Sequence, residues 1–539
     1  MAPRIPKYLC VFGFILLPLG LLQGSQLLFE VGEPAGIVNV SIDTTAVVQN
    51  CDTLEEKTQP NILLIVSEDN GPELGCYGDP YVQTPVLDNL AAKGVRFHNA
   101  YVPQAGCSQS RAAFLTGLYP HQNGQIGLAT WKFQMYREDT PNMVRSLKQA
   151  GYRTGIIGKL HVNPASAFPF DIKKVTSSNF NRKKLGDYAK HAAEFFAAGD
   201  QPFFLSVNYP DAHRPFIKQV KGLPENPLTG KDVKPLAYFG LDAPQLRENT
   251  ADYYNCMSRL DSKIGDLLDA LRKSGKAENT LVVYIGDHGA DMLRGKRTSY
   301  EGGIRIPMII QWPGELQPEQ VRNELVSTLD LMPTFLQAAN ANSVAKLPGL
   351  SLLPLLRNEQ TDWRTYLFTE FHLHSAHNYY PQRTIRNERF KLIHNLMPET
   401  TNPGYAFTLN RFFKGLPETI EGAPNHIRAA YRRMRAPPEF ELYDLEEDPY
   451  EFRNLSEDTN YAEQLSELQT QLSQWRRESN DPLLNQKNLL RLKGEIDACL
   501  EGDSAQKSRL QLNYLDYFFE ESNIGEKHPE QDSNLRPID

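Results

Sequence analysis

The sequence has few cysteines, no excess of basic residues and only one long hydrophobic run. Its six cysteines include no Cys-x-x-Cys pair or Cys/His spacing of the kind that binds zinc. The formal net charge of -8 argues against a nucleic-acid binder, which usually carries a basic surface. This charge does not exclude an anionic substrate, because a local cluster of Lys, Arg and His can bind one within an acidic protein.

The hydrophobic run lies at the N-terminus, where Arg4 and Lys7 precede an apolar stretch over residues 8–22. The stretch is short for a membrane span and predicts a signal peptide over residues 1–25, with a membrane anchor as the alternative. Export would make the protein secreted or periplasmic, or lysosomal in a eukaryote. Five cysteines then remain, an odd number, so one thiol needs a chemical explanation, while the pairing of the others stays open.

Predicted strands and helices alternate through about residue 345, which is typical of the α/β class. We expect a large mixed, mostly parallel sheet sandwiched by helices. Beyond residue 365, short strands with close turns and one helix predict a smaller α+β subdomain. The predicted order is a signal peptide (1–25), a leader (26–59), a catalytic domain (60–365), a C-terminal α+β subdomain (366–480) and a tail with a disordered end (481–539).

Acidic and metal-ligating side chains follow two of the predicted buried strands. Glu68 and Asp69 come after the first strand, and Asp287 and His288 come after a later one. Either pair alone is typical of a turn or a helix cap. Because ligands of open α/β sheets bind at the carboxyl ends of the strands, the two pairs together predict one site for a hard divalent cation.

Basic side chains follow the predicted strands at the same edge of the sheet. Lys159 and His161 follow one strand, His213 follows the next, and Lys296 lies beyond the acidic pair at 287–288. Each alone would be a solvated surface charge. Several at successive strand ends predict a site for a tetrahedral dianion beside the metal.

Cys107 precedes a predicted helix over residues 108–117, so its thiol feels the positive end of the helix dipole. Arg111, four residues later, shares a face with it. From these residues alone, Cys107 is either a buried free cysteine or a reactive thiolate.

The segment Cys107-Ser-Gln-Ser-Arg111, followed by Ala-Ala-Phe-Leu-Thr-Gly, resembles the signature of the formylglycine-dependent sulfatases. The resemblance covers roughly residues 60–480. Within the family, the sequence is most similar to the sulfamidases, or N-sulfoglucosamine sulfohydrolases. It implies an alkaline-phosphatase-like fold. The motifs that occur in the order of the family are Glu68-Asp69, Gly158-Lys-Leu-His161, Asp211-Ala-His213, Asp287-His288-Gly289, Lys296, Tyr300-Glu-Gly-Gly303 and, at the C-terminal end, Glu441-Leu-Tyr-Asp.

The resemblance implies hydrolysis of a sulfate ester or N-sulfate on a glycosaminoglycan-like carbohydrate. Cys107 would be converted to formylglycine (3-oxoalanine) by a maturation enzyme, which is one expected partner beside the sulfated glycan. The implied ligands of Ca²⁺, or of Mg²⁺, are Glu68, Asp69, Asp287 and His288.

The resemblance also assigns roles to the remaining residues. Arg111 and Lys159 would hold the formylglycine, and Lys159, His213 and Lys296 would stabilise charge on the sulfuryl oxygens. His213 would protonate the leaving group, and His161 would assist the release of sulfate. By position alone, His374 and Arg383 of the second domain are expected to contact the sugar.

Three residues depart from the family pattern. Glu68 stands where Asp is usual, His288 stands where Asn is commonest, and Gln109 stands where the maturation machinery normally reads Pro or Ala. Gln109 leaves open a non-catalytic, glycan-binding pseudosulfatase. A phosphoester or phosphonate hydrolase of the same superfamily is the other alternative. The sugar, the linkage and the oligomeric state are left open.

Overall fold

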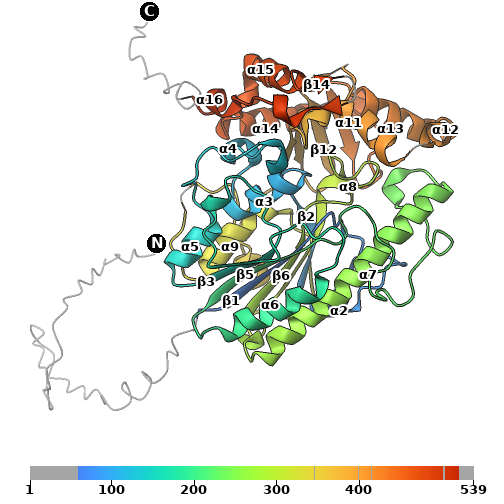
Figure 1. The fold of residues 1–539 in the computed structure, drawn as a ribbon. Helices are drawn as coiled ribbons and strands as arrows, with labels where there is room; N and C mark the ends of the chain where they lie inside the picture. Colours follow the sequence, from blue (N-terminus) through green and yellow to red (C-terminus); the bar gives the residue numbers. More distant parts are fainter. Residues whose placement is uncertain (1–58, 345, 399, 414, 502–503, 521–539) are drawn as a thin grey trace, which may run out of the picture. The chain divides into compact units, whose positions relative to one another are not determined.

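The computed structural model describes residues 59–520, apart from residues 345, 399, 414 and 502–503 (Figure 1). The predicted signal peptide, nearly all of the leader and the end of the tail lie outside the described residues. Among the described residues, no helix is long and apolar enough to cross a membrane. Within the same part of the chain, the four cysteines are free thiols, at positions 76, 107, 256 and 499.

The large sheet has nine strands within the described residues, in the order β4-β3-β5-β1-β6-β7-β2-β8, with β9 beside β2. Strands β3, β5, β1 and β6 are parallel neighbours, whereas β7 runs antiparallel to both β6 and β2. The predicted mixed, mostly parallel sheet is therefore confirmed. Its strands are β1 (Asn61–Ser67), β2 (Val95–Tyr101), β3 (Arg153–Gly158), β4 (Ile172–Lys174), β5 (Phe203–Tyr209), β6 (Thr280–Gly286), β7 (Arg305–Gln311), β8 (Gln320–Arg322) and β9 (Val326–Ser327).

Helices cover both faces of this sheet (Figure 1). Strand β1 is buried throughout, and its side chains alternate between two hydrophobic clusters, as expected for a strand covered on both faces. One cluster includes α2, α6 and α7, and the other includes α3, α5 and α9. These helices are α2 (Pro85–Ala92), α3 (Cys107–Thr116), α5 (Met143–Gln149), α6 (Leu185–Ala197), α7 (Pro244–Lys273) and α9 (Leu331–Ala338).

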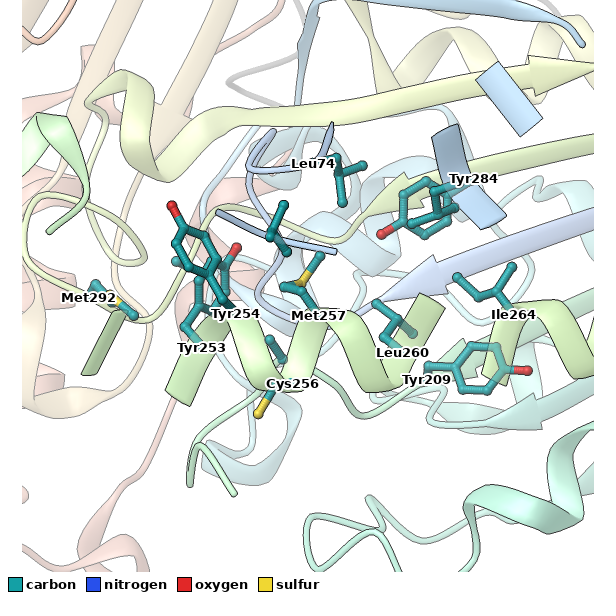
Figure 2. Packing of buried hydrophobic residues seen from close by; sticks show 14 of the residues in the cluster. Leu74, Tyr209, Tyr253, Tyr254, Cys256, Met257, Leu260, Ile264, Tyr284 and Met292 are labelled. Carbon is teal, nitrogen blue, oxygen red and sulfur yellow. The ribbon is translucent and has the colours of Figure 1, made fainter. Parts of the chain in front are cut away.

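Helix α7 shows why a helical apolar stripe packs on a sheet. Met257, Leu260 and Ile264 are buried at a spacing of three and four residues, which places them on one face of the helix. Figure 2 shows these three side chains along one side of α7, near Tyr284 of β6. The amphipathic pattern in the sequence predicts this arrangement.

The C-terminal part contains a four-stranded antiparallel sheet in the order β10-β11-β12-β13. Helix α14 (Ala462–Glu478) packs on it through Leu468 and Leu472. This arrangement matches the predicted smaller α+β unit, although the exact domain boundaries stay a prediction. The strands are β10 (Leu367–Phe371), β11 (Gln382–Arg386), β12 (Phe390–Asn395) and β13 (Phe440–Asp444).

The segment predicted as a tail differs from the expectation through residue 520. It begins with the helices α15 (Gln486–Asp497) and α16 (Tyr514–Phe518). Both helices contribute buried side chains to a hydrophobic cluster that also contains Cys107 and Phe133 of the large domain. The physical reason is that apolar residues recur at helical spacing within an otherwise polar stretch, and they bury one face of α15.

Candidate active site

Cys107 is the first residue of α3, a helix in which every residue is buried. Its Sγ lies 3.3 Å from Lys296 Nζ and 3.4 Å from His288 Nε2. Burial alone would raise the pKa of the Cys107 thiol, but the positive charges of Lys159, Lys296 and His288 outweigh it and hold the pKa well below its usual range. The position favours an anion or a nucleophile, as expected at a helix N-terminus.

The two acidic pairs meet because β1 and β6 are parallel neighbours in register. Ser67 lies opposite Gly286, so the chain leaves both strands at the same edge of the sheet. Beyond that edge, the backbone N–H of Asp69 donates to Asp287 Oδ1 at 2.9 Å. All four predicted ligands are fully buried.

Each acidic side chain of the cluster has a basic partner. Lys159 Nζ donates to Glu68 Oε2 at 2.7 Å, and Lys296 Nζ donates to both carboxylate oxygens of Asp69 at 2.9 and 3.0 Å. Arg111 Nε donates to Asp287 Oδ2 at 3.1 Å. The predicted acids and bases therefore form one buried network around the Cys107 sulfur.

The donor set fits a divalent cation. Asp69, Cys107, Asp287 and His288 present ligand atoms that all lie within 4.8 Å of one another. His288 Nδ1 donates to the Gly289 carbonyl at 2.9 Å, which leaves Nε2 directed at the cluster, as in many metal-binding histidines. Glu68 Oε1 is buried and has no hydrogen-bond partner within the described residues. The two carboxylates and one imidazole of this group suit a hard or borderline divalent ion, while Glu68 lies in a second group with Cys107 and His213.

Without a bound cation, the neighbouring carboxylate of Asp287 favours the protonated form of His288, so the site attracts positive charge. Burial lowers the pKa of His288, but Asp287 more than offsets it and raises the pKa to about 9. A cation bound at Nε2 would replace that proton, since metal binding releases protons from its ligands.

Two further predicted histidines approach the cluster from neighbouring strand ends. His213 Nδ1 donates to the Arg214 carbonyl at 2.5 Å, and a ligand atom of His213 lies within 4.8 Å of those of Glu68 and Cys107. Burial lowers the pKa of His213, but the carboxylate of Asp69 more than compensates, so the net shift is upward. His161 is held in a left-handed conformation with φ 57°, and burial lowers its pKa.

A cavity of about 490 Å³ adjoins this network. Of the predicted residues, His213, Lys296 and His374 line it. Trp131 and Phe407 add aromatic surface of the kind that packs against sugar rings. The other residues of the lining are Leu128, Arg214, Pro215, Asp291, Arg297, Ser375 and His377.

Of the two residues predicted to contact the sugar, His374 lines this cavity and Arg383 does not. The Arg383 side chain is fully buried and donates to Asp481 at 2.7 and 2.9 Å and to His372 Nε2 at 3.1 Å. The expectation of a sugar contact rested on position alone, whereas an ion pair with a residue 98 positions away holds the guanidinium beneath the surface.

Sequence reasoning missed Asn208 and Arg182. Asn208 Oδ1 accepts a hydrogen bond from Arg111 at 2.7 Å, and it lies at the end of β5, where inspection of strand ends would have found it. Arg182 is fully buried, donates to Asp211 Oδ1 at 2.8 Å and contacts the carbonyl of His213. No sequence signal marks Arg182, because it lies in a loop between β4 and α6.

The chain matches the family model described as Sulfatase over residues 60–341. It also matches the model described as N-sulphoglucosamine sulphohydrolase, C-terminal, over residues 286–402. With this fold and this cluster at the strand ends, the chain belongs to the sulfatase family of hydrolases. Among curated proteins, it is 34% identical to the N-sulphoglucosamine sulphohydrolase of Homo sapiens over 468 residues, covering 78% of this chain and 91% of the relative.

Solved structures share the fold at lower identity. One is a protein in complex with its substrate D-glucosamine-2-N,6-O-disulfate, with a TM-score of 0.59 and 22% identity, covering 79% of this chain and 99% of that chain. Another is the phosphonate monoester hydrolase of Agrobacterium radiobacter, with a TM-score of 0.57 and 19% identity, covering 78% and 96%. These likenesses establish the architecture, and the architecture alone does not select the substrate.

Proposed function

We propose that this chain hydrolyses sulfate esters or N-sulfate groups on a glycosaminoglycan-like carbohydrate. The observation that carries the proposal is the position of the Cys107 sulfur, 3.3 Å from Lys296 Nζ, inside a buried cluster of carboxylates and cations. Similarity to an N-sulphoglucosamine sulphohydrolase over most of both chains favours an N-sulfated glucosamine among these substrates.

The proposal includes two groups that this chain would carry. A divalent cation, Ca²⁺ or Mg²⁺, held by Glu68, Asp69, Asp287 and His288, would gather the sulfate oxygens and lower the pKa of the attacking hydroxyl. Formylglycine, made from Cys107 by a maturation enzyme, would supply that hydroxyl as the hydrated aldehyde. The alignment of donors around Cys107 supports both groups.

The protein side chains would position the sulfate and manage its charge. Lys159 and Lys296 carry ammonium groups beside Cys107, where they would stabilise negative charge on the sulfuryl oxygens. Arg111 spans Asp287 and Asn208, which fixes its guanidinium where it would hold the formylglycine.

Two histidines would move the protons. Because Nδ1 of His213 donates to a backbone carbonyl, Nε2 is the nitrogen left for the substrate. The raised pKa of His213 favours the imidazolium, whose Nε2 would carry the proton that reaches the leaving oxygen or nitrogen. His161, whose pKa is lowered by burial, would accept a proton as sulfate leaves the protein. Export through the predicted signal peptide would bring the enzyme to extracellular or lysosomal glycans.

Side-by-side kinetics test the proposal against its alternatives. Purified protein from its native host would be assayed with glucosamine N-sulfate, glucosamine 6-O-sulfate and an aryl phosphate diester, and the Cys107 peptide would be weighed by mass spectrometry. We expect sulfate release, a formylglycine mass, and no turnover by Cys107→Ala. Dominant hydrolysis of the diester would favour the phosphoester hydrolase, and an unconverted thiol without turnover would favour the pseudosulfatase.

A further inference from the structure

Two buried glutamines converge on one backbone carbonyl beside the active site. Gln109 Nε2 donates to the Leu373 carbonyl at 2.6 Å, and Gln104 Nε2 donates to the same oxygen at 3.0 Å. Both amides also reach the Ile126 carbonyl, at 3.3 and 3.2 Å. Both side chains have no solvent exposure, so the double anchor joins helix α3 to the C-terminal part of the chain within the interior.

The orientation of the Gln104 amide follows from its neighbours. Arg383 can only donate, so His372 Nε2 accepts its hydrogen bond at 3.1 Å. The proton of the neutral His372 ring then sits on Nδ1, which donates to Gln104 Oε1 at 3.2 Å. Gln104 Nε2 is therefore the atom that faces Leu373. Arg383, which does not reach the cavity, thus fixes the His372 tautomer and, through it, the orientation of the Gln104 amide.

The residue next to the anchored carbonyl is His374, which lines the cavity together with Lys296. Its backbone N–H donates to Asn378 Oδ1 at 2.9 Å, and its carbonyl accepts from Leu128 N at 3.0 Å. By contrast, its side-chain Nε2 is buried and has no hydrogen-bond partner within the described residues. Both backbone hydrogen-bonding groups of His374 are thus occupied, while its ring nitrogen Nε2 remains available to a ligand.

We propose that Gln109 is a positioning residue that, together with Gln104, holds the Leu373 carbonyl and thereby sets the imidazole of His374 in the wall of the cavity for contact with the sulfated sugar. Gln109 lies two residues from Cys107 on the same turn of α3. The nucleophile and the sugar-contacting histidine are therefore braced from one rigid element. This inference rests on the proposed function for the identity of the ligand, but not for the bracing itself.

The test uses binding rather than turnover, because a Gln109 variant could also change the conversion of Cys107. In a Cys107→Ala background, calorimetry would measure the Kd of glucosamine N-sulfate for Gln109→Leu, His374→Ala and the double variant. We expect each single change to weaken binding about 10-fold, since small displacements of a positioned group are costly. The double variant should be no weaker than His374→Ala, within about twofold, because both changes remove the same contact.

A matched control is Gln125→Leu, another fully buried glutamine, whose Nε2 donates to the Gly127 and Phe133 carbonyls at 2.7 and 2.9 Å. It should lose comparable thermal stability and keep the Kd within about twofold. An unchanged Kd for Gln109→Leu, or losses that multiply in the double variant, would overturn the inference. If Gln109→Leu does not fold, Gln104→Leu is subject to the same expectations.

A second readout needs no ligand. In protein with ¹⁵N-labelled histidine, the ring signals of His374, assigned by their loss in His374→Ala, should move in Gln109→Leu and stay in place in Gln125→Leu. If the Cys107→Ala parent binds no glucosamine N-sulfate, the proposed substrate is wrong, and this spectrum alone decides the bracing. Unmoved His374 signals in Gln109→Leu would refute it.

Discussion

At the scale of single residues, Asp287 connects two parts of the site. Its Oδ1 accepts from the Asp69 backbone at 2.9 Å, and its Oδ2 accepts from Arg111 at 3.1 Å. Asp287→Asn keeps the shape but removes the charge, so we expect the bound Ca²⁺ or Mg²⁺ to be lost and kcat/KM to fall about 100-fold or more. Elemental analysis of the purified protein would measure the metal directly.

Asp261→Asn is the matched control for that change. The Asp261 carboxylate is also buried and accepts two backbone N–H groups, from Leu87 at 2.8 Å and from Val86 at 3.0 Å, at the start of α2. It should lower the melting temperature while leaving the metal content intact. Full metal occupancy in Asp287→Asn would contradict the shared-cation site.

Phe180 bears on the protonation of the leaving group. Its ring stacks on the ring of His213, with centroids 4.1 Å apart and planes 14° apart, and the Lys159 ammonium lies 5.3 Å from its centroid. Phe180→Leu removes the stacking surface, so His213 Nε2 loses its fixed direction. We expect kcat to fall about 10-fold with a sugar substrate but hardly at all with an activated aryl sulfate, whose phenolate leaves without needing a proton.

The conservative variant Phe180→Tyr keeps the stacked ring and should retain kcat within about twofold on both substrates. Steady-state kinetics on the two substrates give the comparison. Equal losses on both substrates in Phe180→Leu would show a general loosening of the site and would contradict a role in orienting the proton donor.

At the scale of elements, the sequence predicts where the site lies better than it predicts the order of the strands in the sheet. The chain order of β1, β3, β5 and β6 does not reveal their arrangement β3-β5-β1-β6. The site is nevertheless predictable, because parallel strands end at one edge in any order, so Asp69, Lys159 and Asp287 meet there. Contacts between distant segments are different. Nothing in β11 shows that Arg383 faces Asp481 instead of a sugar.

The spacing of apolar residues in α15 predicts a helix, although the composition of the segment does not. Leu489, Leu492 and Ile496 are buried at a spacing of three and four residues, which is the pattern of one helix face. Because the stretch is polar on average, its composition predicts part of a tail. What it covers could not be predicted, because its cluster includes residues as distant as Phe133, more than 350 residues earlier in the sequence.

At the scale of the whole molecule, the last described segment closes the interior around the active site. Helices α15 and α16 share a hydrophobic cluster with Cys107, Ile126 and Phe133. Tyr514 on α16 donates to the Gly124 carbonyl or the Gln134 carbonyl, each at 2.8 Å. The hydrophobic cluster beside the active site thus depends on helices that lie outside both matched family models.

Truncation after residue 485 removes both helices but keeps Asp481 and its ion pair with Arg383. Among the described residues, eight buried members of the hydrophobic cluster are lost, at positions 489, 492, 496, 499, 510, 514, 517 and 518. At about 1.5–3 kcal/mol each, their burial is comparable to the whole stability of a typical domain. We therefore expect the truncated protein to aggregate or to melt far below the full chain in calorimetry. Truncation after residue 520 should keep both melting temperature and turnover, because every described residue of the cluster remains. A shortened protein ending at residue 485 that is stable and active would mean that the catalytic interior closes without these helices.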